Sequence, residues 1–221
     1  MLKTKNSLFE LTIIIVFFAF GINKSFPQVT DYDGNTYKTV SMGTQEWIAE
    51  NLNVSHYRNG DSIPQVKDSA EWSTLKTGAL CYYENNSENG KIYGKLYNWY
   101  AVMDPRGLAP EGWHIPGEEE WKQLEDVLGG YLVAGGKLKA TTLWISPNTG
   151  ATNESGFSGF PGGLRDHEWG FKYINKYGCF WSSSEEDSTS AFDRNLKYDN
   201  SDVFRYSSYK SFGLSCRCVR D

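Results

Sequence analysis

The sequence lacks any run of lysine or arginine, and its 221 residues carry a formal net charge of −5. Proteins that bind nucleic acid usually gather basic residues into a patch or stripe. An acidic chain without such a run has no surface of this kind in its sequence. We therefore expect no nucleic-acid partner.

Residues for catalysis and metal binding are also few. The sequence has only three histidines, His56, His114 and His167, and no G-x-S-x-G or comparable nucleophile motif. Histidines and cysteines do not cluster with the spacing of metal ligands. The E-P-N, Q-P-D and W-N-D signatures of sugar-binding C-type lectins are absent as well. We therefore expect no catalytic residue, no metal and no cofactor.

Two alternatives stay open. Glycoside hydrolysis needs only two carboxylates close together, which sequence cannot exclude, and the candidates near predicted loop ends are Glu154 and one of Glu185 or Glu186. A calcium site of the lectin type is the other, because Asn and Asp are plentiful.

Long apolar runs are limited to LTIIIVFFAF at 11–20, which is too short to span a bilayer comfortably. Lys3 and Lys5 precede it and small or polar residues follow, an order typical of a secretory signal peptide. We assign residues 1–27 to this signal, with cleavage between about residues 21 and 28. A retained signal anchor is the alternative. We expect a secreted or cell-surface protein with no membrane span in the mature chain.

Cysteines number four, all in the mature part: Cys81, Cys179, Cys216 and Cys218. An even number in an exported chain favours disulfides over zinc. Residues at i and i+2 on a strand point to the same face, so Cys216 and Cys218 each need their own partner. We expect them to pair with Cys179 and Cys81 in some order. Free buried thiols are the alternative.

Aromatic residues make up 15% of the chain, which also has 22 glycines. Many rings with many turn formers indicate a loop-rich fold with short strands and a core of large rings. Asp33-Gly34 predicts a hairpin turn, and residues 68–75 a short helical turn. A helix is predicted over 94–103, because apolar side chains recur there at i, i+3, i+4 and i+7: Leu96, Trp99, Tyr100 and Met103.

The stretch GWHIPGEEEW (112–121) places a histidine and three carboxylates between two tryptophans. Pro116-Gly117 predicts a helix start, where Glu118–Glu120 meet unpaired N–H groups and the positive end of the helix dipole. A buried stripe runs from Trp121 to Leu128, and Gly129-Gly130 ends the helix. We interpret the acids as a helix start rather than as an acid/base or metal site.

The second half begins with a long loop over 145–163 and continues as strands separated by tight turns. The expected strands are 178–184, 191–198, 203–209 and 212–220. With two helices before them, these strands predict the α+β class.

Six ordered blocks carry a family resemblance: TVSMGTQEWIAENL, YGKLYNWYAV, GWHIPGEEEW, TNESGFSGFPGGLR, FWSSSE and CRCVRD. Together they closely resemble the Fibrobacter succinogenes major paralogous domain, over residues 28–221. That family occurs in exported proteins, and the resemblance implies no catalytic assignment.

A more distant similarity concerns the fold. HIPGEEEW resembles the R-L-P-T-E-A-E-W helix start of formylglycine-generating and related sulfatase-modifying proteins, and GLSCRCVR resembles their G-F-R-x-V-R strand. This similarity implies a C-type-lectin-like fold, with two helices flanking a small antiparallel sheet and long irregular loops. No motif here matches the active cysteine pair of the generating enzymes, so their chemistry is not implied.

The family pattern also bears on the cysteines. Positions 179 and 216 are more often aromatic or aliphatic in the family, so the resemblance implies that Cys179 and Cys216 bond each other. Cys81 and Cys218 would then form the second pair.

Ligand-binding residues are expected in loops with exposed tryptophan, whose flat face suits the C–H surface of a pyranose. In RDHEWGF (165–171), Arg165, Asp166 and His167 crowd beside Trp169, and Trp144 lies in another loop. The alternative for 165–171 is a polar hairpin tip with the tryptophan folded onto the core.

These observations predict an exported, non-catalytic binding module that recognises glycans or surface proteins. The alternatives are a carbohydrate-active or protein-modifying enzyme with a site in the loops, and a purely structural or adhesive module. The sequence does not indicate an oligomeric state.

Overall fold

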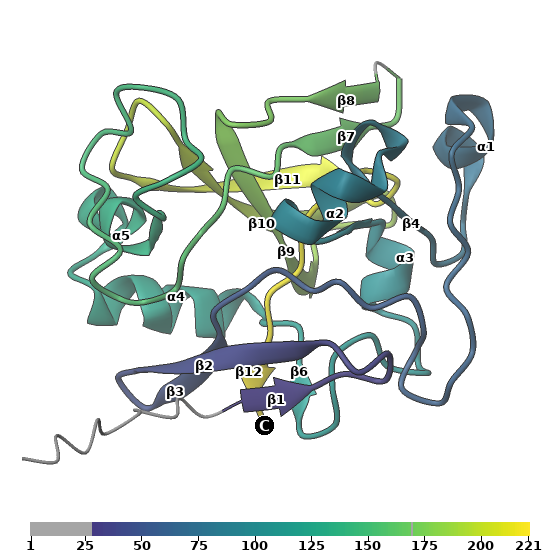
Figure 1. Cartoon of the computed structure of the whole chain (residues 1–221), viewed down its shortest axis with the longest axis horizontal. Coiled ribbons are helices and arrows are strands. Elements are labelled where there is room, and N and C mark those ends of the chain that lie inside the picture. Colours follow the sequence, from purple (N-terminus) through teal and green to yellow (C-terminus); the bar gives the residue numbers. More distant parts are fainter. Residues whose placement is uncertain (1–27, 169) are drawn as a thin grey trace, which may run out of the picture.

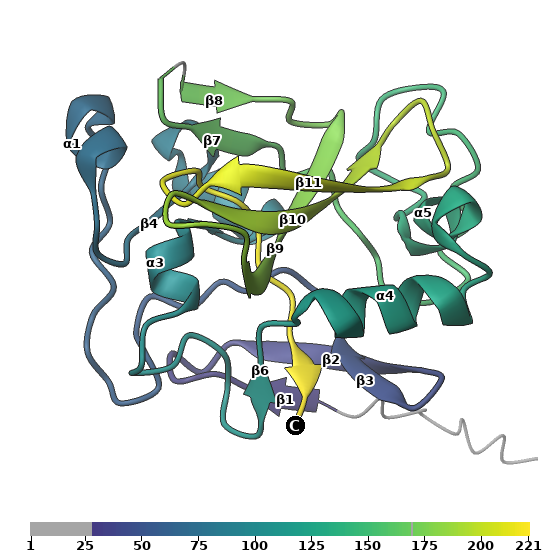
Figure 2. The same cartoon turned by 180° about the vertical axis from the view of Figure 1, so that it is seen from behind.

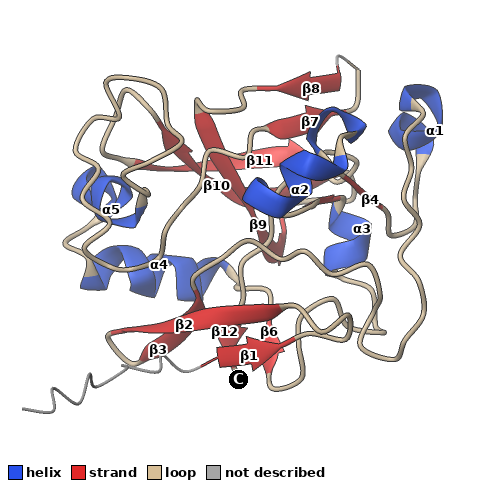
Figure 3. Ribbon diagram, in the orientation of Figure 1, coloured by secondary structure: helices blue, strands red, loops and turns tan. Residues whose placement is uncertain are grey.

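The computed structural model describes residues 28–168 and 170–221, so the expected signal peptide and Trp169 lie outside the described residues. Figure 1 shows two main sheets joined by long connections, with helices beside them. Long loops make up much of the chain (Figure 3). The α+β class is confirmed, but the described residues contain five α-helices rather than two.

The first sheet brings both ends of the described chain together. Its strand order is β1-β2-β3-β12-β6, and all neighbouring strands are antiparallel. The strands are β1 (Gln28–Thr30), β2 (Thr36–Met42), β3 (Gln45–Ile48), β12 (Val219–Arg220) and β6 (Trp113–His114). The predicted turn at Asp33-Gly34 connects β1 to β2, and Gly34 has a φ of 81°, which glycine adopts without strain.

The second sheet has the order β11-β10-β9 and matches three predicted strands closely. Its strands are β9 (Tyr177–Glu185), β10 (Ser190–Lys197) and β11 (Val203–Tyr209). Helices α4 (Glu118–Val127) and α5 (Tyr131–Leu138) pack beside this sheet (Figure 2). The hairpin of β7 (Leu164–Asp166) and β8 (Gly170–Lys172) also lies next to it. β11 pairs with β10 on one side only, so it is an edge strand of this sheet.

Helix α4 starts and ends where the sequence predicts. The Gly117 N–H donates to Oε2 of Glu120 at 2.8 Å, which closes the first turn. Trp121 and Leu124 are buried on the inner face. Glu118–Glu120 occupy the first turn, as expected from the favourable interaction of carboxylates with a helix N-terminus.

The predicted helix over 94–103 is wrong in most of its length. Leu96 and Tyr97 form β5 (Leu96–Tyr97), which pairs with β4 (Leu80–Cys81), and only α3 (Trp99–Val102) is helical. Asn98 separates the two elements, because its side chain accepts from the N–H groups of Ala79 and Ala101. The apolar spacing reflected burial of a strand and a helical turn in succession.

Shorter elements complete the chain. They are α1 (Ser69–Thr74), which fits the predicted helical turn, a 3-10 helix η1 (Tyr83–Asn85) and α2 (Ser87–Tyr93).

The predicted strand over 212–220 is mostly an irregular segment that runs between the sheets. Only Val219–Arg220 joins a sheet, while isolated bridges link Gly213 to Arg165, Leu214 to Tyr97 and Ser215 to Phe180. This segment therefore meets β7, β5, β9, β3 and β6 in turn.

Large rings form the core, as the composition indicates. Trp47 lies 4.9 Å from Trp121 between ring centroids, and Phe157 lies edge-on to Phe180 at 5.8 Å. The five tryptophans in predicted elements or family blocks are at most 7% exposed: Trp47, Trp99, Trp113, Trp121 and Trp181.

Three buried cations order the loops between these elements. The Lys139 ammonium donates to the carbonyls of Thr149, Lys197 and Asn200 at 2.7–2.9 Å. Arg165 and Arg217 likewise donate to main-chain carbonyls. A carbonyl that accepts such a bond is satisfied without regular secondary structure, so these cations replace sheet hydrogen bonds within the irregular regions.

All four cysteines are buried as free thiols, so the expected disulfides are not formed in this structure. Cys81 packs in a different core cluster from the other three, which separates it from its expected partner Cys218. The alternative of free buried thiols describes the observed state.

Among the helices of the described residues, none is both long and apolar enough to cross a membrane.

Candidate functional site

The hairpin β7–β8 carries the expected ligand-binding residues, but Arg165 has no exposed surface for a ligand. Its guanidinium donates to the carbonyls of Val66, Lys67 and Asp68 at 2.7–3.1 Å and lies 4.3 Å from the ring of Trp72. A fully buried charged group needs hydrogen-bond partners. Because the carbonyls before α1 supply them, Arg165 holds this segment in place.

The other expected residues are only partly accessible. Asp166 is buried, accepts from the N–H of Glu168 and forms an ion pair with Lys172 at 2.5 Å. His167 packs edge-on against Tyr209, with ring centroids 4.7 Å apart. Trp169 itself lies outside the described residues.

Trp144 is half-buried and is not part of this hairpin. Its Nε1 donates to the carbonyl of Gly159 at 3.0 Å, and the Lys139 ammonium lies 5.5 Å from its ring. Trp144 thus packs against Gly159 and Lys139 rather than beside Asp166 and His167.

A groove beside this hairpin is a better-built candidate. It has a volume of about 330 Å³ and lies over the second sheet, between β11 and the loop that follows β8. We call it the tyrosine groove; its lining residues are Leu164, Tyr173, Tyr177, Asp193, Asn195, Lys197, Tyr206, Ser207 and Ser208. Sequence reasoning missed it, since these residues come from four strands and a loop.

Strand register explains why these side chains meet. Asp193 lies opposite Tyr206 on β11, and Lys197 lies opposite Tyr177 on β9. Side chains alternate along a strand, so Asp193, Asn195 and Lys197 share one face of β10. Arg194 lies on the opposite face, where it pairs with Glu118 and Glu125 of α4.

Aromatic rings form the sides of the tyrosine groove. Tyr173 stacks on Tyr177, with centroids 4.5 Å apart and planes inclined by 18°. Phe204 and Tyr206 lie nearly parallel on β11, with centroids 6.0 Å apart. Tyr173 and Tyr206 are each 44% exposed, so ring faces or edges remain accessible to a ligand.

Polar groups form the floor. The Lys197 ammonium donates to the hydroxyl of Tyr206 at 2.9 Å and lies 5.3 Å from the ring of Tyr177. Oδ2 of Asp193 accepts from the amide of Asn195, whereas Oδ1 is buried with no donor in hydrogen-bond geometry, although the Ser208 hydroxyl is near enough to lower the pKa of Asp193. Burial raises the pKa of Asp193 to about 6, against the opposing effects of Ser208, Asn195 and Arg194.

A second depression continues the tyrosine groove along β11. The two share Ser207 and Ser208, and the second also includes Tyr209, which is 53% exposed. His167 of the hairpin lies against Tyr209 at this end. The expected hairpin site and the observed groove are therefore neighbours on one surface.

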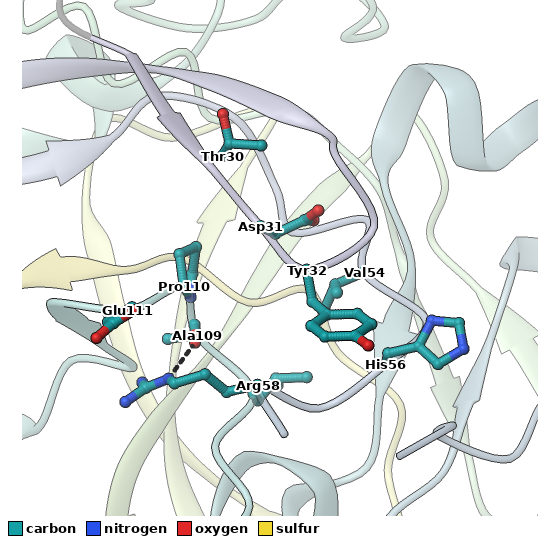
Figure 4. Close-up of a pocket in the computed structure, with 10 residues that line it drawn as sticks. Thr30, Asp31, Tyr32, Val54, His56, Arg58, Ala109, Pro110 and Glu111 are labelled. Atoms are coloured by element: carbon teal, nitrogen blue, oxygen red, sulfur yellow. Dashed lines mark hydrogen bonds between the residues drawn. The ribbon is translucent and has the colours of Figure 1, made fainter. Parts of the chain in front are cut away.

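A separate cavity of about 210 Å³ lies near the first sheet. In Figure 4, Tyr32 and His56 stand on one side of it, with Arg58, Pro110 and Glu111 on the other. Arg58 donates to the carbonyl of Ala109 at 3.1 Å, as the dashed line shows.

Beside this cavity His56 and Asp33 form a pair, with Nδ1 and Oδ1 2.5 Å apart. Burial would raise the pKa of Asp33, but hydrogen bonds from the Ser55 N–H and from His56 outweigh it and lower the pKa. A His–Asp pair orients a general base, yet nucleophilic catalysis also requires a hydroxyl or thiol at the histidine. The hydrogen bonds of residues 28–168 and 170–221 place no such group on His56.

The carboxylates considered for glycoside hydrolysis all have other partners. Glu154 pairs with Lys137 at 2.9 Å, Glu185 pairs with Lys210, and Glu186 accepts from Ser207. Within the described part of the chain, no group of three or more histidine, cysteine or acidic side chains is placed to hold a metal ion.

The fold thus defines an α+β domain of small antiparallel sheets, and one of its surface sites is a groove lined with aromatic and polar side chains. The chain belongs to the Fibrobacter succinogenes major domain family, whose family model matches residues 40–220. No curated protein matches the chain in a sequence search.

Proposed function

We propose that this chain is an exported, non-catalytic binding module that recognises a glycan in the tyrosine groove. The observation that carries the proposal is the arrangement of Tyr173, Tyr177 and Tyr206 around a polar floor. Aromatic rings supply apolar faces for the C–H surface of a sugar, while a few fixed polar groups determine its orientation.

Export and fold are parts of the same proposal. The order of charges and apolar residues in 1–27 supports a secretory signal peptide, and hence a secreted or cell-surface location. The resemblance to sulfatase-modifying proteins supports a C-type-lectin-like arrangement, in which irregular loops surround a small sheet. A binding role that uses loops and the edge of a sheet agrees with both.

The test is a glycan array with purified residues 28–221, with and without calcium, beside Tyr206→Ala and Tyr173→Ala variants. We expect saturable binding that both substitutions weaken. Tyr131→Ala is the matched control, because Tyr131 is 57% exposed at the start of α5, outside the groove. Binding that survives both groove substitutions would contradict the location.

Two further variants separate the neighbouring candidates. Trp169→Ala tests the hairpin tip, and Tyr32→Ala tests the cavity of Figure 4. Loss of binding in one of these alone would move the site away from the tyrosine groove. Silence across the array would overturn glycan recognition and favour a protein partner at the edge strand β11.

A further inference from the structure

The tyrosine groove contains one carboxylate, that of Asp193, and one ammonium, that of Lys197. Asp193 is 1% exposed and its Oδ1 has no donor in hydrogen-bond geometry. A buried acceptor left without a donor costs free energy that a ligand donor would recover. The groove therefore offers a carboxylate oxygen that a hydroxyl group can satisfy once the floor side chains adjust.

Lys197 supplies donors from the same floor. An ammonium has three N–H donors, and in the described structure the Tyr206 hydroxyl accepts one of them. The rings of Phe204, Tyr206 and Tyr177 surround the ammonium at 4.0, 5.2 and 5.3 Å. These contacts hold the charge above β10, two positions along the strand from Asn195 and four from Asp193.

Charge in the groove is balanced rather than positive. Arg194, the other cation on β10, lies on the opposite face of the sheet and does not line the groove. There it pairs with Glu118 at 2.6 Å and with Glu125 at 2.7 Å. A sugar carboxylate would need an unpaired cation and would meet the Asp193 carboxylate instead. Like charges at close range disfavour binding.

We infer that the tyrosine groove selects a neutral sugar, some of whose hydroxyl groups donate to Asp193 while others accept from Lys197 and Asn195. This inference rests on the proposed function and adds the class of ligand. A hydroxyl is both donor and acceptor, so the hydroxyl groups of one neutral glycan can satisfy the Asp193 carboxylate and the Lys197 ammonium together. A sugar carboxylate only accepts hydrogen bonds, so it would satisfy Lys197 but not Asp193.

Calorimetric titration with soluble tetrasaccharides tests the inference. The neutral probes are the tetramers of β-1,4-linked glucose and β-1,4-linked mannose, and the acidic probe is the tetramer of galacturonic acid. We expect one neutral probe to bind and the acidic probe not to bind. Asp193→Asn and Lys197→Met should each weaken binding about tenfold or more, since each removes a hydrogen bond to a charged group.

Matched substitutions on α4 control for general effects of charge. Lys122 and Asp126 form an exposed ion pair there, remote from the groove lining. We expect Asp126→Asn and Lys122→Met to bind like the parent chain. Thermal melting of all four variants checks that each is folded before its affinity is compared.

The outcomes separate the inference from the proposed function. Binding of the acidic probe that Tyr206→Ala abolishes would overturn the inference and keep glycan recognition in the groove. Unchanged affinity in folded Asp193→Asn and Lys197→Met would also overturn the inference. If no probe binds and the array is silent as well, both statements are wrong.

Discussion

Arg217 donates from Nε to Oδ1 of Asn51 at 2.7 Å, although the two residues are 166 positions apart. The same guanidinium donates to the carbonyls of Ile48, Phe157 and Ser158. It is fully buried and lies 4.2 Å from the ring of Phe157. One side chain near the C-terminus therefore joins the first sheet to the long loop that ends near residue 163.

Arg217→Met should destabilise the fold strongly. The substitution removes the donor from three buried acceptors and one partly buried acceptor, so we expect a loss of about 3–5 kcal/mol in the free energy of unfolding. Urea unfolding followed by tryptophan fluorescence measures it. Arg220→Met is the control, because Arg220 is 61% exposed and forms an ion pair with Glu46, and an exposed pair contributes about 1 kcal/mol or less. Equal losses in the two variants would contradict the role of Arg217.

The sequence predicted α4 and the strands of the second sheet because their signals are local. Carboxylates and Pro116-Gly117 mark the start of α4, and tight turns separate β9, β10 and β11. Helix α5 was missed because Gly135 and Gly136 weaken helix propensity. The structure supplies the reason for Gly135: a Cβ there would lie 2.3 Å from the carbonyl oxygen of Asp202.

The tyrosine groove could not be predicted for a different reason. Its residues meet through strand register and through the loop that carries Tyr173, neither of which a single sequence determines. A partial signal was present, since placing Arg194 and Leu196 on one face of β10 leaves Asp193, Asn195 and Lys197 on the other. Similarly, Arg165 was expected at a ligand site because sequence does not distinguish a buried cation from an exposed one.

Asp193 should make stability depend on pH. Burial raises its pKa to about 6 from the ordinary value of 3.8, so the folded chain holds this proton more readily than the unfolded chain. The stabilising contribution is complete below about pH 4 and is lost as the pH rises through 6, a difference of roughly 3 kcal/mol at most. Urea unfolding of the parent chain and Asp193→Asn at several pH values measures it. A difference between the two that does not change with pH would contradict the raised pKa.

The cysteines should react only after unfolding. Burial raises the pKa of the Cys81 thiol to about 11 and raises those of the other three well above the ordinary value. Few thiolates form at neutral pH, and buried sulfur is inaccessible to reagents. We expect no alkylation of the native chain and four alkylated thiols per chain in denaturant without reductant. Fewer than four, restored to four by reductant, would instead establish disulfides in the exported protein.

His114 joins the C-terminus to the start of α4. Its Nδ1 lies 2.7 Å from Asp221 and its Nε2 lies 2.7 Å from Glu120. Partial burial lowers the pKa of His114, but the two carboxylates outweigh this effect and raise it. The ion pairs should therefore stabilise the fold fully below about pH 6.5, the ordinary pKa, and lose this effect as the pH rises through the raised value. Because His114 is 41% exposed, solvent screening keeps the contribution below about 1 kcal/mol.

An NMR titration of the His114 ring measures the shift directly. We expect a midpoint above the ordinary pKa in the parent chain and a lower midpoint in Glu120→Gln, which keeps a side-chain acceptor for the Gly117 N–H but removes one charge beside His114. Glu119→Gln is the matched control, since Glu119 lies in the same first turn of α4 without a bond to His114. If both substitutions lower the midpoint equally, the general field of the acidic turn raises the pKa. If Glu120→Gln alone lowers it, the direct ion pair is the cause. The role of the stretch GWHIPGEEEW is then structural, because His114 links Asp221 to the first turn of α4.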